Sequence, residues 1–196
     1  MLEPEKYYHI YNRGNNRENI FKEEKNYSYF LKLYERHIDP VAETYAYCLM
    51  KNHFHLLVKI KEHLPSNLPG FQNLEGDRNP SRAFSNLFNA YTKSINKMYH
   101  RTGSLFEKNF HRIEVTSDSY FSRLVQYIHF NPQHHGFCDD FRTYPYSSFN
   151  IILSETETKI NRNSVIQWFG GREEFIEFHK NVTKEKEIAD LIGDDI

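Results

Sequence analysis

Apolar and polar residues recur along the first two thirds of the chain in patterns that separate strands from helices. Period-two runs rich in Tyr, Ile and Val predict strands, whereas apolar residues three or four apart predict amphipathic helices. Strands are expected at 6–13, 41–50, 53–60 and 104–115, the last of them irregular. Helices are expected at 24–38, at 81–100, and from Ser117 or Asp118 to about Phe130, with Asn131-Pro132 as the end of the third. A loop rich in Pro and Gly is expected at 61–80.

The resulting order, βαββαβ followed by one more helix, is that of the ferredoxin-like fold. We therefore predict an α+β protein with an antiparallel four-stranded sheet, two helices on one face and the additional helix elsewhere. Residues 133–196 differ from the rest, because they are acidic and show only short helical patterns near 162–168 and 171–180. We expect them to form a C-terminal α-helical appendage packed on the domain formed by residues 1–132.

The net charge of −1 averages two unlike parts of the chain. Residues 1–132 hold 18 Lys and Arg against 14 Asp and Glu, whereas residues 133–196 hold 7 against 12. Within the first part, residues 78–113 hold seven basic side chains and a single acid, Glu107. Such an excess can form a phosphate-binding face or simply a solvated helix surface. The near-neutral total therefore does not exclude a nucleic-acid partner.

The remaining composition narrows the class of protein. Hydrophobic residues make up 39% of the chain, enough for a core, and 16% of all residues are aromatic. Two cysteines, Cys48 and Cys138, make a disulfide framework unexpected and favour a reducing cytoplasm. The sequence shows neither an apolar run long enough for a membrane-spanning helix nor an apolar signal core at its start, so we expect no membrane partner and no secretion.

Two short motifs carry candidate chemistry. In His53-Phe54-His55 the two imidazoles would leave one face of a strand side by side, as two ligands of one metal must. Tyr127 and Asn131 are four residues apart, so on a helix they are neighbours on one face. Each motif alone is more often structural: two surface histidines in the first case, a core tyrosine and a helix-ending asparagine in the second.

Together, and in this order of elements, the motifs resemble those of the HUH single-tyrosine transposases, and within them the REP-associated tyrosine transposase-like branch. The resemblance runs from about residue 6 to 150. It is carried by the segments YHIYNRG at 8–14, AYCLMKNHFHLLV at 46–58, GSLF at 103–106, YIHFNP at 127–132 and YPYSS at 144–148.

The resemblance implies a role for each of these residues. Residues 1–132 would be the catalytic domain, with His53 and His55 as metal ligands, Tyr127 as the nucleophile and Asn131 as a third polar ligand of Mg²⁺ or Mn²⁺. It implies metal-dependent cleavage and rejoining of single-stranded or hairpin DNA, through a 5′-phosphotyrosine intermediate and a free 3′-hydroxyl. Relatives act as monomers or homodimers, and both remain open here. The nearby His129, His134 and His135 are not expected to be ligands.

Candidate DNA contacts are the polar and basic residues after the first strand and along the basic stretch. They are Arg13, Asn15, Arg17, Lys93, Lys97, Lys108 and Arg112. For each of them ordinary surface solubility is the competing interpretation.

Two alternatives remain. One is another HUH enzyme, a replication initiator or relaxase. The other is a non-catalytic or domesticated nucleic-acid binder, because the RNA-recognition motif has the same βαββαβ order and stacks bases on its open sheet.

Overall fold

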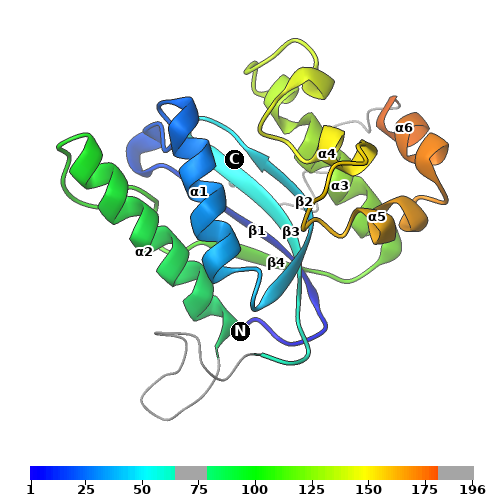
Figure 1. Cartoon of the computed structure of the whole chain (residues 1–196), viewed down its shortest axis with the longest axis horizontal. Helices are drawn as coiled ribbons and strands as arrows, with labels where there is room; N and C mark the ends of the chain where they lie inside the picture. The colour runs from blue at the N-terminus through cyan, green and yellow to red at the C-terminus, as the bar shows by residue number, and fades with distance from the viewer. Residues whose placement is uncertain (65–78, 181–196) are drawn as a thin grey trace.

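The computed structural model describes residues 1–64 and 79–180. Four strands form one antiparallel sheet in the order β2-β3-β1-β4. Their bounds are β1 (Tyr7–Arg13), β2 (Ala42–Leu49), β3 (His53–Ile60) and β4 (His111–Val115). β1 and β3 are adjacent at the centre of the sheet (Figure 1). Side chains of paired residues on these two strands are therefore close neighbours.

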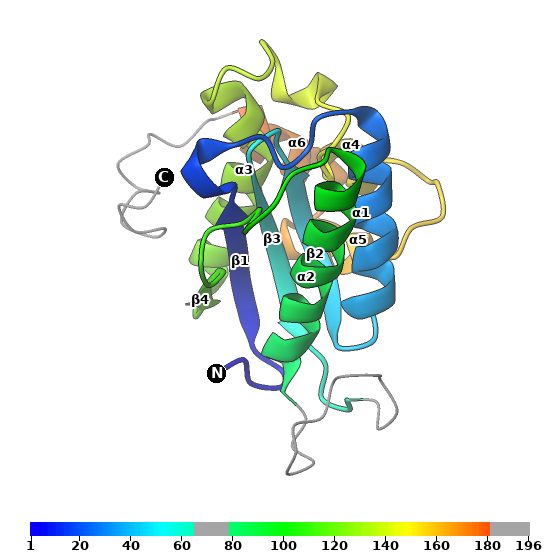
Figure 2. The same ribbon diagram turned by 90° about the vertical axis from the view of Figure 1, so that its left-hand side faces the viewer.

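Helices cover both faces of the sheet. α1 (Glu24–His37) and α2 (Pro80–Met98) lie on one face, and α3 (Asp118–His134) lies on the other, as the two perpendicular views agree (Figures 1 and 2). The first core forms between the sheet and α1 and α2. Its wholly buried members include Ile10, Phe30, Phe54, Phe84 and Tyr91. This layer forms because every second side chain of a strand points to one face of the sheet, and apolar side chains three or four residues apart share one face of a helix.

A second core forms on the opposite face, between the sheet, α3 and the C-terminal helices. These helices are α4 (Phe149–Leu153), α5 (Arg162–Trp168) and α6 (Arg172–Lys180). Phe121 and Leu124 of α3 belong to the same apolar cluster as Val165 of α5 and Phe175 of α6. The C-terminal segment therefore covers the helix that follows the sheet and shares its core.

A chain of hydrogen bonds between buried side chains joins α6 to α3. His129 Nδ1 lies 2.9 Å from His179 Nε2, and His129 Nε2 lies 2.8 Å from Ser148 Oγ. His179 Nδ1 donates to the Phe175 carbonyl, and Ser148 Oγ accepts from the Tyr47 amide. Every polar atom in this series has a hydrogen-bond partner when His179 donates to the Phe175 carbonyl, His129 donates to His179, and Ser148 donates to His129. His129 is thus a structural residue turned away from Tyr127, as its position on the helix predicted.

Three local expectations differ from the structure. Residues 104–110 are irregular, and only His111–Val115 form β4. α3 continues through Pro132 to His134, because the His135 amide bonds the Asn131 carbonyl and the Phe137 amide bonds the Pro132 carbonyl. One missing N–H is therefore tolerated in the last turn. Two 3₁₀ turns, η1 (Asn15–Arg17) and η2 (Phe141–Thr143), occupy segments with no predicted element, as does α4. Most of the expected loop at 61–80 lies outside the described residues.

Gly14 ends β1 where two backbone segments approach closely. A Cβ at this position would lie 2.0 Å from the Glu18 carbonyl oxygen and 3.2 Å from an Ile20 methyl. The Gly14 amide also donates to the Asn52 carbonyl over 2.7 Å, which ties the loop after β1 to the turn before β3. The close contact is with backbone, so it cannot be relieved by a rotamer change.

We therefore expect Gly14→Ala to lower the free energy of unfolding by about 1–3 kcal/mol, the usual cost of forcing volume into a packed site. Urea titration followed by circular dichroism measures it. Asn19→Ala, at an exposed position in the same loop, is the control and should change stability by less than about 0.5 kcal/mol. Equal stability of the Gly14 variant and the wild type would contradict the close approach.

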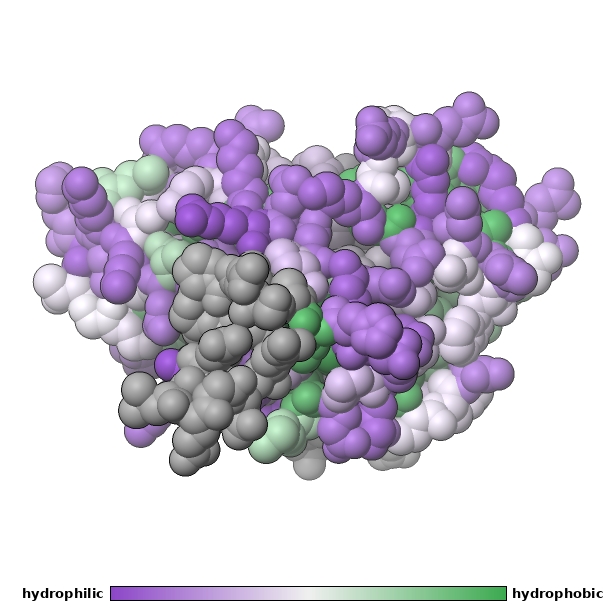
Figure 3. Space-filling model, turned by 60° about the horizontal axis from the view of Figure 1, so that its bottom comes forward, coloured by the Kyte–Doolittle hydropathy of each residue, from purple (hydrophilic) through white to green (hydrophobic). Residues whose placement is uncertain are grey.

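The surface in Figure 3 is mainly hydrophilic, with small separate apolar areas. None of the helices in the described ranges is both long and apolar enough to span a bilayer.

Candidate active site

The site begins with the alternation of side chains along β3. Phe54 points into the first core, where it packs against Phe30 and Phe88. His53 and His55 leave the opposite face of the sheet, with ring centroids 5.4 Å apart. Both are buried, with 8% and 1% of their surface exposed. The predicted pairing of the two imidazoles on one face is therefore present, but at the base of a covered site instead of an open surface.

α3 brings two further side chains over this pair. The ring of Tyr127 stands edge-on to that of His55, with centroids 5.4 Å apart. One turn later, Asn131 Oδ1 lies 3.2 Å from His53 Nε2. Tyr127 and Asn131 are both buried. Two motifs more than seventy residues apart in sequence, one on β3 and one on α3, thus meet in one place.

Burial controls the protonation of this cluster. It lowers the pKa of His53 to about 4 and the pKa of His55 well below its usual value, with a further lowering from neighbouring histidines. Burial also raises the pKa of Tyr127, against a smaller opposing effect of the Asn131 side chain. At neutral pH the imidazoles are therefore uncharged and have lone pairs to offer, while the phenol keeps its proton.

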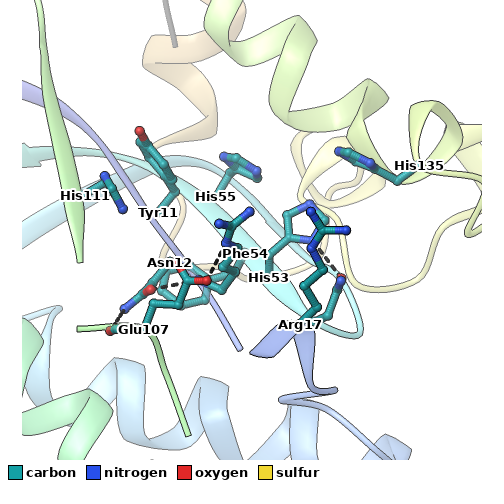
Figure 4. A pocket seen from close by; sticks show the side chains of 11 residues that line it. Tyr11, Asn12, Arg17, His53, Phe54, His55, Glu107, His111 and His135 are labelled. Carbon is teal, nitrogen blue, oxygen red and sulfur yellow. Dashed lines mark hydrogen bonds and ion pairs between the residues drawn. The ribbon is translucent and has the colours of Figure 1, made fainter. Parts of the chain in front are cut away.

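A cavity of about 310 Å³ opens beside the two histidines. Figure 4 shows Tyr11 and His111 on one side of it and His135 on the other. Arg17 faces the same space, and Arg13 forms a 2.7 Å ion pair with Glu107 at its margin. The cavity thus places two guanidinium groups next to two neutral imidazoles, a combination suited to an anionic ligand.

The candidate DNA contacts divide into three groups. Arg13 and Arg17 line the site cavity. Lys108 and Arg112 line a neighbouring groove of about 530 Å³, which shares Asn12 and Glu107 with the cavity. The other three candidates line neither space. Asn15 is half-buried in η1, and Lys93 and Lys97 are exposed on α2.

The donor set can be tested against a divalent cation. The buried atoms His53 Nε2 and Asn131 Oδ1 lie 3.2 Å apart. This separation is short enough for both atoms to bind one small cation. A third atom, His55 Nε2, is buried without a hydrogen-bond partner. Within residues 1–64 and 79–180 no three His, Cys, Asp or Glu side chains gather in ligand geometry, so an ion here would rest on two imidazoles and an amide. That mixed set fits Mg²⁺ or, better, Mn²⁺.

Sequence reasoning missed two histidines of this site. His9 on β1 is wholly buried and lies against His55. The ring of His135 packs edge-on against that of His53, with ring centroids 4.8 Å apart. The sequence predicts that His135 follows the end of the helix and is not a ligand, but α3 continues past Pro132 to His134, and His135 at its end lines the cavity. The period-two pattern of β1 contained a signal for His9, because Tyr7, His9 and Tyr11 share one face of that strand.

Known proteins similar to the chain were found by sequence and by fold. No protein-family model matches the chain. A REP-associated tyrosine transposase of Haemophilus influenzae is 26% identical over 117 residues, which cover 55% of this chain and 59% of that relative. The chain therefore matches a little over half the length of this curated relative.

A solved structure of a REP-associated tyrosine transposase bound to a REP hairpin has a similar fold, with a TM-score of 0.59. The two sequences are 16% identical, and the match covers 79% of this chain and 83% of the solved chain. The predicted α+β class and antiparallel four-stranded sheet are confirmed by this shared fold. In sequence and in fold, the chain is similar to REP-associated tyrosine transposases.

Proposed function

We propose that the protein is a metal-dependent single-stranded DNA endonuclease and strand transferase of the HUH tyrosine type, acting in DNA transposition. The observation that carries the proposal is the meeting of Tyr127 and Asn131 with His55 and His53 in one buried cluster. A phenol nucleophile, two neutral imidazoles and an amide oxygen are the groups that such a reaction requires, and one chain supplies all of them.

His53, His55 and Asn131 would hold the divalent cation, which is proposed as Mg²⁺ or Mn²⁺. When bound, the cation supplies Lewis-acid stabilisation of the charge that develops on the phosphate. The Asn52 side chain would fix His53, because Asn52 Oδ1 lies 2.8 Å from His53 Nδ1 and a proton on Nδ1 would be donated to it, which would leave a lone pair on Nε2. The ligand atoms are thus oriented before any ion arrives.

Tyr127 would attack the scissile phosphorus through its phenolic oxygen. A Tyr–O–P bond forms, the bond from phosphorus to the 3′-oxygen breaks, and the 3′-oxygen leaves with a proton as a hydroxyl. The phenolic proton passes to water or a neighbouring base, which is needed because burial raises the pKa of Tyr127. The product is a 5′-phosphotyrosine that keeps the phosphodiester's bond energy, so attack by a new 3′-hydroxyl rejoins the strand.

Arg13 and Arg17 are placed to receive the phosphates that flank the reacting one, because both line the site cavity. Burial of the cluster means that a phosphate reaches Tyr127 only if its strand is free to bend inward, so single-stranded or hairpin DNA is the proposed substrate. The structurally similar transposase was solved with a REP hairpin, which supports this choice.

The alternative of a nucleic-acid binder of the RNA-recognition type is disfavoured by the covered sheet. In that fold one sheet face is open to stack bases. Here α1 and α2 cover one face and α3 the other, and Tyr7 packs edge-on against Phe121 and Trp168 instead of facing solvent. The chain offers no comparable open platform among the described strands.

The metal assignment predicts a specific loss. The double substitution His53→Ala and His55→Ala should abolish Mn²⁺ binding by titration calorimetry and reduce DNA cleavage to the level seen without metal. The physical reason is that both proposed imidazole ligands disappear, while the fold persists because neither His53 nor His55 is a member of the two apolar cores. The substrate is a hairpin oligonucleotide with randomised single-stranded flanks.

The matched control is the double substitution His63→Ala and His100→Ala, which removes two exposed histidines that do not line the site cavity. It should bind Mn²⁺ and cleave as the wild type does. Undiminished cleavage and Mn²⁺ binding by the His53, His55 variant would show that these histidines are not the ligands.

A further inference from the structure

His9 lies directly behind one of the two candidate metal ligands. It is on β1, next to β3, and its side chain is wholly buried. Its Nε2 lies 2.9 Å from His55 Nδ1, and the two rings are stacked with an interplanar angle of 19°. A buried contact of this length between two imidazole nitrogens contains one shared proton, because one must donate and the other accept.

The direction of that hydrogen bond decides whether His55 can bind a cation. If His9 donates, His55 carries its own proton on Nε2, and a protonated nitrogen is no ligand. If His55 donates from Nδ1, its Nε2 keeps a lone pair. That Nε2 is buried and has no hydrogen-bond partner, on the same face of β3 as His53.

His53 shows a similar arrangement. Its Nδ1 lies 2.8 Å from Asn52 Oδ1 and its Nε2 lies 3.2 Å from Asn131 Oδ1, and a neutral ring can donate to only one of these oxygens. The shorter contact favours the tautomer with the proton on Nδ1, which leaves the lone pair of Nε2 facing Asn131. The two candidate ligands thus each have a side chain of this protein behind Nδ1. Asn52 stands behind the first and His9 behind the second.

We propose that His9 is a positioning residue that accepts a hydrogen bond from His55 Nδ1 and thereby holds His55 in the tautomer whose Nε2 can bind a divalent cation. The inference rests on the proposed metal site at His53 and His55. His9 itself is not a ligand in this arrangement, because its Nε2 accepts from His55 and its Nδ1, which has no hydrogen-bond partner, carries the proton of the neutral ring. Its role resembles that of the carboxylates and carbonyls that usually orient metal-bound histidines.

The experiment measures the tautomers directly. Long-range ¹H–¹⁵N spectra of ¹⁵N-histidine-labelled protein distinguish Nδ1–H from Nε2–H for each ring, without metal and with Mg²⁺. In the wild type we expect Nδ1–H on both His53 and His55 in both conditions. In His9→Phe, which keeps a ring but removes the acceptor, His55 should leave the Nδ1–H form while His53 keeps it. Asn52→Ala should give the reciprocal result.

Metal affinity supplies the second measurement. We expect Mn²⁺ to bind His9→Phe about 10- to 100-fold more weakly than the wild type, the usual effect of removing an orienting partner. His9→Gln, whose amide oxygen can accept at the position of the imidazole Nε2, should restore most of the affinity. A purely packing role for His9 predicts the reverse order, because phenylalanine fills the site better than glutamine.

The possible failures are separable. An Nε2–H tautomer of His55 in the wild type overturns the inference, and so does unchanged Mn²⁺ affinity in a folded His9→Phe variant. Absence of Mn²⁺ binding by the wild type overturns the proposed metal site instead, and the wild-type spectrum still shows whether His9 sets the tautomer of His55. That spectrum also decides the question if His9→Phe fails to fold.

Discussion

Tyr127→Phe is expected to abolish the covalent protein–DNA adduct. The substitution removes only the phenolic oxygen, which is the proposed attacking atom. The other tyrosine beside His55 is Tyr11 on β1, whose ring stacks on His55 instead of standing edge-on to it as Tyr127 does. Loss of a nucleophile costs roughly 10⁴-fold or more in rate. With 3′-labelled DNA the wild type should yield a labelled protein band in a denaturing gel, because the 5′-phosphate end stays on the tyrosine. The variant should yield none.

Tyr120→Phe is the matched control for this substitution. Tyr120 is also a buried tyrosine of α3, in the turn nearest its start. Its variant should form the adduct at a rate close to that of the wild type, which separates loss of the nucleophile from general damage to the helix. DNA affinity of the Tyr127 variant should stay within a few-fold of wild type. A persistent adduct in Tyr127→Phe would assign the nucleophile to another residue.

Acid should destabilise the metal-free protein steeply, because the described residues include five buried histidines: His9, His53, His55, His129 and His179. Burial lowers the pKa of His9 to about 3, of His53 and His179 to about 4, and of the other two well below 6.5. Below pH 6.5 the unfolded state therefore binds protons that the native state does not, so the free energy of unfolding falls as pH falls.

Each histidine contributes up to about 1.4 kcal/mol per pH unit in the window from about 6.5 down to its native pKa. Five together contribute roughly 7 kcal/mol per unit, which is comparable to the whole stability of an ordinary domain. We expect unfolding near pH 5, measured by urea titration in EDTA at half-unit steps. His179→Gln should lower the slope by about one proton, whereas His63→Gln, at an exposed site, should leave it unchanged. A pH-independent stability between 7 and 5.5 would contradict the neutral, buried state of these rings.

Local patterns in the sequence predict most of the fold. Period-two runs located β1, β2 and β3 within a residue or two, and the apolar spacing of α2 located it to within two residues. The pattern failed where structure depends on contacts that are distant in sequence. Residues 104–110 contain Leu105 and Phe106, which are apolar and buried as in a strand, yet their backbone makes only an isolated bridge between Phe106 and Gly14, and regular pairing with β1 begins at His111.

The candidate site divides in the same way. The two pairs, His53 with His55 and Tyr127 with Asn131, follow from strand and helix periods, which place each pair on one face. His9 could not be assigned, because its contact with His55 depends on the register of β1 against β3, which pairs Tyr11 with His55. The place of His135 depended on a helix that continues through a proline, where the local rule predicts a stop.

The distance in sequence between the two halves of the site has a consequence for synthesis. A ribosome releases β1, β2 and β3, with all three of His9, His53 and His55, long before it releases α3. A nascent or truncated chain that ends before Asp118 contains His9, His53 and His55 but lacks Tyr127, the proposed nucleophile. Under the proposed function, the chain would therefore gain the ability to cleave DNA in a single step, when α3 docks on the completed sheet, and an incomplete chain would not cut DNA.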